Sequence, residues 1–168
     1  MSLLRAGALV TGMAGMVVLA KVLSRPRVVS EEEKRAYEQQ VLRDVNETRL
    51  RRGLSPLSED EELDTLGRYY AGLMRATRTF AHQIDKNSVG ARMKRFDVGF
   101  ERAAENLQRN DLRSRARAAD ETVWGDGGWM NSKAGHREAM LDPDYQKAGI
   151  GVDSDGRTWH VAMYFKGE

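Results

Sequence analysis

The residues of this chain best suited to chemistry are two histidines and a glutamate that stand in short, separate motifs. His82 ends a Phe-Ala-His motif, His136 lies in Gly-His-Arg, and Glu105 lies between them in Ala-Glu-Asn-Leu. Neutral imidazole is a good ligand for zinc, and a carboxylate serves as a third ligand or orients a histidine. If the three meet in space, they form a small polar cleft that could hold zinc or another divalent metal.

The same residues also have a purely structural interpretation. His82 and His136 could be a hydrogen-bonded pair that fixes loops, and Glu105 could accept hydrogen bonds inside the fold. Asn106 is expected to fix a turn or a strand end. The chain has no cysteine, which excludes disulfides, thiolate nucleophiles and cysteine-ligated zinc. No serine lies in a nucleophile-elbow motif, so we expect no catalytic residues and lean against an enzyme.

Composition indicates one globular domain with an appendage. The chain has 168 residues, of which 40% are hydrophobic and 31% charged, so it can bury a core. The formal charge of +2 comes from residues 1–30, which hold four basic residues and no acid. The remainder has 23 basic against 25 acidic residues and is about −2. No basic face is evident, so nucleic acid is not an expected partner.

The appendage is a hydrophobic segment over residues 1–25. Residues 6–20 are apolar or small throughout, and as a helix they span roughly 22 Å. Extension to residues 3–23 would let the segment cross a hydrocarbon core of about 30 Å. Three interpretations stay open: a retained membrane anchor, a cleaved signal peptide, or a segment of the mitochondrial inner membrane. A buried core helix is disfavoured because the segment has no polar face.

Two amphipathic helices are predicted to follow. Ser30 to Glu33 is a capping box that starts the first, and Asn46 and Arg49 are expected to join this helix to the strand region. Ser58 to Glu61 is interpreted as a second capping box. The buried positions of the second helix are predicted to be Leu63, Leu66, Tyr70, Leu73 and Thr77.

The second half mixes helices with a small sheet. We predict a short helix over 88–96 with Val89, Met93 and Phe96 on one face, a strand or loop edge over 102–108, and helices over 116–124 and 129–140. A Ser-Asp-Gly turn at 154–156 predicts a C-terminal β-hairpin. The class is α+β, since strands do not alternate regularly with helices.

Some side chains receive individual predictions from this pattern. Alternation along 159–165 puts His160 on one face, where we expect it at the surface. Core positions are expected for Trp124, Trp129 and Trp159. Four arginines within 109–117 are either a phosphate-binding patch or, as is more common, a solvated face.

Six motifs, in order, resemble the CAP superfamily (the SCP or cysteine-rich secretory protein family) in its bacterial, cysteine-free form. They cover roughly residues 37–166 and are Asn46-Glu47-Thr48-Arg49, Gly53-Leu54-Ser55-Pro56-Leu57, Phe80-Ala81-His82, Ala104-Glu105-Asn106-Leu107, Trp129-Met130-Asn131-Ser132 with Gly135-His136-Arg137, and Lys147-Ala148-Gly149-Ile150-Gly151-Val152. The chain then divides into the hydrophobic segment 1–25, a linker with the start of the first helix (26–36), and a CAP/SCP-like domain (37–168).

The resemblance implies a three-layer α-β-α sandwich with a C-terminal hairpin. It also implies a cleft of two histidines and two glutamates, which binds zinc or another divalent ion in some members. His82, His136 and Glu105 match this cleft, whereas Ser132 stands in place of the second glutamate. Ala139 replaces an asparagine that bacterial members usually carry. The cleft is therefore incomplete.

The family is mostly exported, and its members are mostly binding and signalling proteins. The resemblance therefore implies a non-catalytic, extracytoplasmic binding module for a lipid, glycan or protein, either secreted or held on the membrane through residues 3–23. The alternative is a membrane-anchored accessory subunit of a larger membrane complex with a degraded cleft. A metal-dependent hydrolase is the least favoured interpretation.

Overall fold

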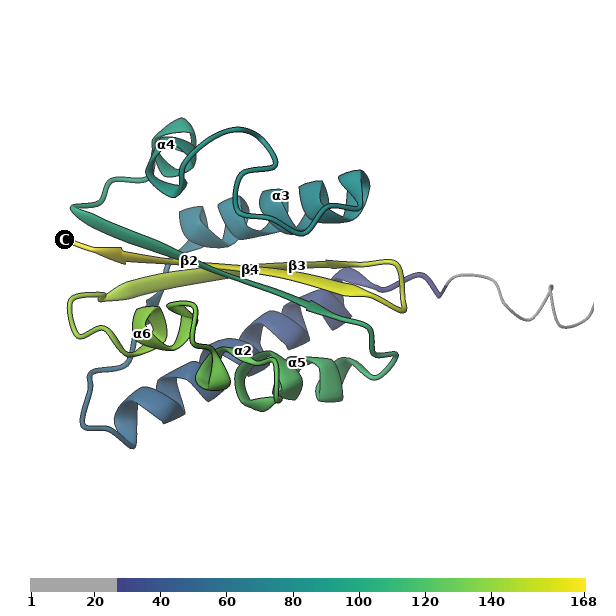
Figure 1. Cartoon of the computed structure of the whole chain (residues 1–168), viewed down its shortest axis with the longest axis horizontal. Coiled ribbons are helices and arrows are strands. Elements are labelled where there is room, and N and C mark those ends of the chain that lie inside the picture. Colours follow the sequence, from purple (N-terminus) through teal and green to yellow (C-terminus); the bar gives the residue numbers. More distant parts are fainter. Residues whose placement is uncertain (1–26) are drawn as a thin grey trace, which may run out of the picture.

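A four-stranded mixed sheet lies between two layers of helices (Figure 1). The computed structural model describes residues 27–168. The predicted segment 1–25, with its proposed membrane contact through residues 3–23, lies outside the described residues. No helix within the described part is both long and apolar enough to cross a bilayer. The three layers confirm the α+β sandwich expected from the sequence.

The elements follow one another in the order α2, β1, α3, α4, β2, α5, η1, α6, β3, β4. The helices are α2 (Glu31–Leu50), α3 (Glu61–Thr77), α4 (Val89–Arg95), α5 (Arg115–Trp124) and α6 (His136–Leu141), with a 3₁₀ turn η1 (Trp129–Asn131). The strands are β1 (Ser58–Glu59), β2 (Arg102–Asn110), β3 (Lys147–Ser154) and β4 (Trp159–Gly167). The strand order β1-β3-β4-β2 makes β2 an edge strand.

Helix α2 begins and ends through side-chain contacts that the sequence anticipated. Ser30 and Glu33 form the capping box, with each side chain accepting from the other residue's backbone N–H. Asn46 holds both backbone groups of Leu57. The buried Arg49 donates to the carbonyls of Ser55, Met140, Asp142 and Tyr145. These bonds fasten α2 to the segments that enter β1 and β3.

The second capping box was wrong. Ser58 lies in β1, and the N-cap of α3 is Asp60, whose side chain accepts from the Leu63 N–H at 3.1 Å. The reason is tertiary: the Ser58 and Asp60 N–H groups donate to carbonyls of residues 146 and 148. Along α3 the last buried position is Met74, since Leu73 is half-buried and Thr77 is exposed.

The alternation along β4 divides the core as predicted. Trp159, Val161, Met163 and Phe165 pack against α2 and α5, whereas Ala162 and Tyr164 pack against α3 and α4. Helix α3 lies directly on β3 because glycines meet there. A Cβ on Gly67 would lie 2.5 Å from the Gly151 nitrogen. The α3 face of the sheet carries two polar regions described below, one around Glu105 and one around His160.

The helix predicted over 129–140 was wrong as a single element. The chain makes the η1 turn, then an extended residue at Ser132, and only then α6. Gly135 has φ 94°, a left-handed conformation that glycine adopts without steric cost. This break sets His136 at the first position of α6 instead of inside a continuous helix.

Two further predictions of burial were wrong. Trp124 is 37% exposed, while Trp129 and Trp159 are fully buried as expected. His160 was expected at the surface but is only 7% exposed. Its face of β4 is covered by α3, and a single polar side chain in an alternating strand does not show which face a helix covers.

Candidate functional site

The edge strand β2 brings the two predicted histidines together. His82 comes from the loop after α3 and His136 from α6, and their ring centroids lie 6.2 Å apart. Successive side chains of a strand point to opposite faces, so Glu105 and Asn106 reach the two layers separately. Glu105 Oε1 lies 2.7 Å from His82 Nδ1, and the Asn106 amide donates to the His136 carbonyl at 2.9 Å. All three predicted residues therefore meet at what we call the β2-edge site.

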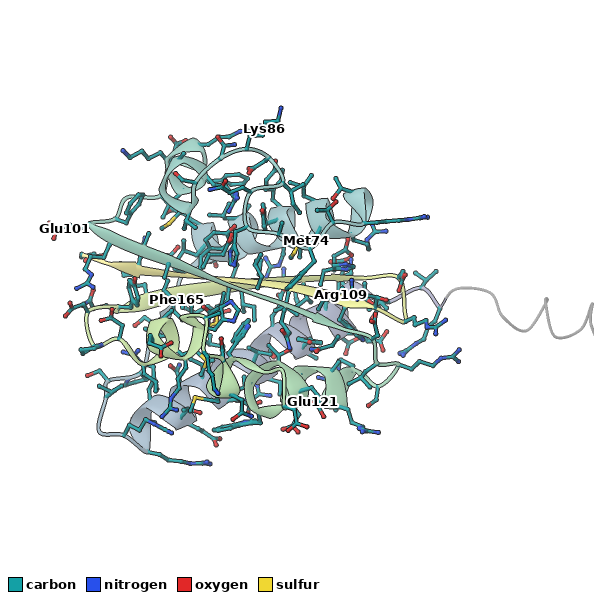
Figure 2. The ribbon with its side chains drawn as sticks, in the orientation of Figure 1. Met74, Lys86, Glu101, Arg109, Glu121 and Phe165 are labelled. Carbon is teal, nitrogen blue, oxygen red and sulfur yellow. The ribbon has the colours of Figure 1, made fainter. Side chains whose placement is uncertain are left out.

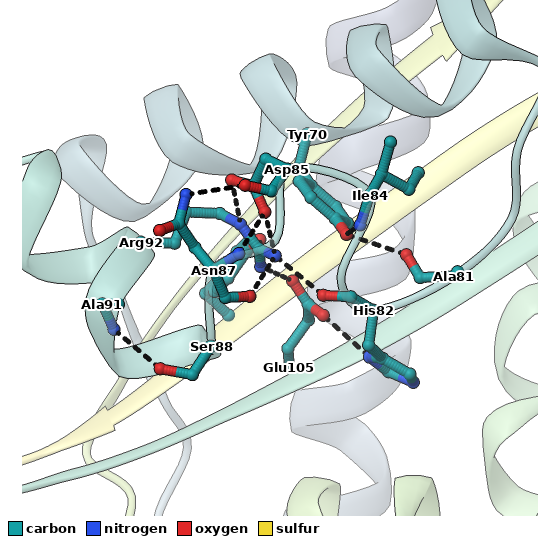
Figure 3. Close-up of polar contacts among 11 residues, drawn as sticks. Tyr70, Ala81, His82, Ile84, Asp85, Asn87, Ser88, Ala91, Arg92 and Glu105 are labelled. Carbon is teal, nitrogen blue, oxygen red and sulfur yellow. Dashed lines mark hydrogen bonds and ion pairs between the residues drawn. The ribbon is translucent and has the colours of Figure 1, made fainter.

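The Glu105 carboxylate is fully engaged (Figure 3). One oxygen accepts from His82, so His82 Nδ1 carries the proton. The other accepts from Arg92 Nη1 at 2.6 Å, and neither the Glu105 nor the Arg92 side chain has any exposed surface. A carboxylate buried between an imidazole and a guanidinium positions those groups.

Arg92 is the centre of a larger network, which we call the Arg92 cluster (Arg92, Glu105, Asp85, His82 and Tyr164). Its guanidinium donates to the Asp85 carboxylate at 3.0 and 3.1 Å, to the His82 carbonyl at 2.7 Å and to the Tyr164 hydroxyl at 2.9 Å. It also lies 3.7 Å from the centroid of the Tyr70 ring, a cation–π contact. Every donor nitrogen of this buried cation is satisfied, as a buried charge requires.

The charge state of the cluster is fixed by these contacts. Burial alone would raise the pKa of Asp85, but hydrogen bonds from Arg92 and Asn87 lower it to about 2. Burial lowers the pKa of Arg92, and its bonds to Asp85 and neighbouring groups outweigh this, so the net pKa is raised. Burial and then the Glu105 charge raise the pKa of Tyr164. At neutral pH the cluster holds a cationic Arg92, an anionic Asp85 and a neutral Tyr164.

His136 is kept neutral by its surroundings. Burial is the largest cause that lowers its pKa, and the nearby His82 lowers it further. A neutral imidazole can accept as well as donate a hydrogen bond. The β2-edge site therefore presents one neutral ring beside a second ring whose Nδ1–H is already committed to Glu105.

The fit of this site to a metal ion is limited by Glu105. His82 and His136 could each offer one ring nitrogen, while Glu105 is placed to orient His82 and lies against a guanidinium. Among residues 27–168, no group of three or more histidine, aspartate or glutamate side chains is arranged to hold a metal. Ser132, in place of the family's second glutamate, accepts from the Ala134 N–H at 3.1 Å. Metal binding by His82, Glu105 and His136 stays a prediction.

Sequence reasoning missed Arg92 and Asp85. Arg92 lies three residues after Val89 and four before Phe96, so it shares the face of α4 that was predicted to be apolar. An arginine inside an apolar stripe signals a buried cation that needs a partner. The identity of its partners, Asp85 in a loop and Glu105 on β2, depends on the fold and carried no signal in the sequence.

The fold and the β2-edge site together define a class of protein. The sequence model of CAP, the cysteine-rich secretory protein family, matches residues 42–165. The chain therefore belongs to the cysteine-rich secretory protein family. The match confirms the resemblance that the motifs indicated.

Particular relatives are bacterial. The chain is 32% identical to the uncharacterized protein YkwD of Bacillus subtilis over 125 residues, which cover 74% of this chain and 45% of YkwD. It is 31% identical to the uncharacterized membrane protein YlbC of the same organism over 155 residues, covering 89% of this chain and 41% of YlbC. The chain thus spans less than half the length of these relatives.

A solved structure shares the fold. An extracellular protein from Bacillus anthracis that contains an SCP domain superposes with a TM-score of 0.68 at 22% identity, covering 84% of this chain and 45% of that one. At this identity the likeness concerns the fold alone.

Proposed function

We propose that this chain is a non-catalytic, extracytoplasmic binding module whose ligand contacts the β2-edge site. The extracytoplasmic placement is supported by a structural neighbour described as extracellular and a relative described as a membrane protein. The predicted hydrophobic segment 1–25 would serve as the export signal or anchor. Placement on the membrane through residues 3–23 is part of the same proposal.

The observation that carries this proposal is that both oxygens of the Glu105 carboxylate already have partners within the protein. A general acid or base must be free to exchange a proton with the reacting group. Both Glu105 oxygens are held, one by His82 and the other by the buried Arg92. The fixed carboxylate instead holds the His82 ring in one orientation, with the ring largely exposed to a ligand.

The exposed part of the site favours a polar ligand. The His82 side chain is 53% exposed and lies beside His136. Phe80, which precedes His82 by two residues in the sequence, is 46% exposed. Imidazole edges exchange hydrogen bonds with hydroxyl groups, and an aromatic ring packs on the apolar face of a sugar. Among the glycan, lipid and protein ligands that were expected, a glycan is therefore the first to test.

The test is co-sedimentation of the full-length protein with isolated cell-wall glycan. We expect His82→Gln with His136→Gln to weaken binding about tenfold, through loss of about 1.4 kcal/mol of hydrogen bonding. Lys133→Gln, a change at an exposed residue between η1 and α6, should bind like the wild type. Equal sedimentation of the wild-type protein and the double variant with the glycan would contradict the proposal.

The hydrolase alternative is separated in the same experiment. Soluble fragments released by the wild type and abolished in the double variant would show catalysis and overturn the non-catalytic assignment. Elemental analysis of the purified protein tests the metal prediction, since zinc at one equivalent that disappears in the double variant would support a His82 and His136 site. Recovery of the protein only within a larger membrane complex would favour the accessory-subunit alternative.

A further inference from the structure

A second polar hollow lies on the α3 face of the sheet, at the other end of β2. Asp153, His160 and Arg109 are direct neighbours across β3, β4 and β2. Arg109 follows Glu105 by four residues on the same face, which at about 3.4 Å per residue puts the two roughly 14 Å apart. The hollow measures about 540 Å³. Figure 2 shows Arg109 near the β3–β4 turn and Glu101 at the opposite end of the strand.

We call this hollow the arginine pocket. Its polar lining consists of Arg75, Arg78, Arg109, Thr158, His160 and two carboxylates, Asp111 and Asp155. Its three cations differ in how far they are neutralised. Arg75 forms an ion pair with Asp153, and Arg109 lies 3.4 Å from Asp111. Arg78 is exposed and makes no side-chain hydrogen bond or ion pair with the described residues. One guanidinium is therefore free to bind a ligand.

His160 supplies an unsatisfied group beneath these arginines. Its side chain lines the pocket while being only 7% exposed, and its Nδ1 has no hydrogen-bond partner within residues 27–168. Burial, and then the charge of Arg109, lower its pKa, so the ring is neutral. A buried polar nitrogen without a partner costs free energy unless a bound group pairs with it.

The carboxylates that line or border the pocket already accept hydrogen bonds. Asp111 accepts from the Thr158 hydroxyl at 2.7 Å, and Asp155 accepts from the backbone N–H groups of Arg157 and Thr158. Asp153 accepts from Arg75, from Lys34 and from the backbone of Ser154. The groups left without partners are the Arg78 guanidinium and the His160 imidazole. The Arg78 guanidinium can only donate hydrogen bonds, so the group that complements it is an anion.

We propose that the arginine pocket binds the phosphate group of a phosphate ester. Arg78 and Arg109 both line the pocket, and a guanidinium can donate two hydrogen bonds to phosphate oxygens, the geometry in which arginine recognises phosphate. The neutral, buried ring of His160 would lie beneath the phosphate as part of the pocket floor. The hollow is larger than a single phosphate, so part of the organic group enters with it. This site is separate from the β2-edge site and does not depend on its function.

The position of the pocket in the chain suggests where such a phosphate comes from. Arg27 lies against the β3–β4 turn, since a Cβ on Gly156 would be 2.2 Å from the Arg27 carbonyl oxygen. The hydrophobic segment predicted over residues 3–23 ends four residues earlier in the sequence, and four residues of chain span at most roughly 14 Å. A lipid phosphate and a soluble phosphate ester share this chemistry, and the experiment separates them.

The experiment measures binding of the full-length protein to two probes. Calorimetry with glycerol 3-phosphate tests the soluble ester, and flotation with phosphatidic acid vesicles, against phosphatidylcholine vesicles, tests the lipid. We expect Arg78→Ala to weaken binding to the responding probe about tenfold, the size of one charged hydrogen-bonded contact. Arg95→Ala on α4, an exposed arginine outside the pocket, is the matched control.

Each outcome decides the proposal. Binding of either probe that is lost in Arg78→Ala and kept in Arg95→Ala supports the pocket, and the probe that responds identifies the source of the phosphate. No binding of either probe by the wild type overturns the proposal. Equal losses in the two variants also overturn it, because attraction would then depend on total charge and not on this pocket.

Discussion

The Arg92 cluster and the arginine pocket lie on the same face of the same sheet, yet they use arginine in opposite ways. In the Arg92 cluster the cation has no exposed surface and every donor is bound to a protein group. In the arginine pocket Arg78 has no partner among the described residues and His160 has an unpaired nitrogen. The donors of Arg92 all have partners within the protein, whereas the arginine pocket contains polar groups that have none among the described residues.

The difference shows how burial decides what a charged side chain contributes. Removing one member of a buried network leaves the others desolvated and unpaired, so the energetic effect appears in the stability of the fold. Removing an exposed charge costs the fold little, so an effect appears only when a ligand is present. The predictions below test this contrast through the free energy of unfolding and through binding.

The largest effect is expected from Arg92→Met. The change leaves the buried Glu105 and Asp85 carboxylates without their cation, and breaking a buried pair in this way costs about 3–5 kcal/mol. Urea unfolding measures the loss. Adding Glu105→Gln to Arg92→Met should recover part of it, because one of the two stranded charges is removed. A loss below about 1 kcal/mol would show that the cluster is not the structural centre described here.

An acid-dependent effect of about 2 kcal/mol is expected from Asp85. Hydrogen bonds from Arg92 and Asn87, acting against burial, hold its pKa near 2 in the folded protein, below the ordinary 3.8. A depressed folded pKa gives stability that is complete above pH 4 and is lost as pH falls toward 2, because the unfolded state then takes up the proton first. The side chain is 8% exposed, so solvent screens it little.

The measurement is the stability of Asp85→Asn relative to the wild type across that pH range. The variant should be about 2 kcal/mol less stable at pH 7, and the gap should close as pH falls from 4 toward 2. Glu101→Gln, an exposed acid without a side-chain partner among the described residues, is the control. A gap that stays constant between pH 5 and 2.5 would mean that Asp85 acts by shape and not by charge.

Much of the fold could be predicted because its elements depend on local pattern. The capping box at Ser30, the alternation along β4 and the hairpin turn need no knowledge of distant residues. The predictions that failed depend on tertiary contacts. Ser58 lies in the sheet because the N–H groups of Ser58 and Asp60 bond to the carbonyls of residues 146 and 148, and His160 is buried because α3 covers its face of β4. Neither partner is near in sequence, so propensity alone could not assign these residues correctly.

The β2-edge site, the Arg92 cluster and the arginine pocket differ in how readily their residues could be predicted from the sequence. His82, Glu105 and His136 stand in motifs, and the structure brings them together at β2. Arg92 was missed because its partners come from a loop and a strand that only the fold brings together. In the arginine pocket, Arg109 was noted within a basic run, but Arg75, Arg78 and His160 come from other elements. Because the residues of the arginine pocket come from three separate segments, they have no regular spacing in the sequence by which the pocket could be predicted.

The smallest effect, expected from Arg78→Gly, tests the contrast most sharply because it has two readouts of opposite sign. Arg78 has φ 53° and ψ 30° as the C-cap of α3, a left-handed conformation that favours glycine. Glycine there should raise the free energy of unfolding by about 1 kcal/mol, while binding to the phosphate probe falls about tenfold as in Arg78→Ala. Alanine keeps the backbone strain, so Arg78→Ala should lose binding without gaining stability.

If glycine instead lowered stability, Arg78 would stabilise the fold, and the arginine pocket would then resemble the Arg92 cluster in its role. A gain in stability together with lost binding would mean that this position keeps a strained arginine for the sake of its ligand.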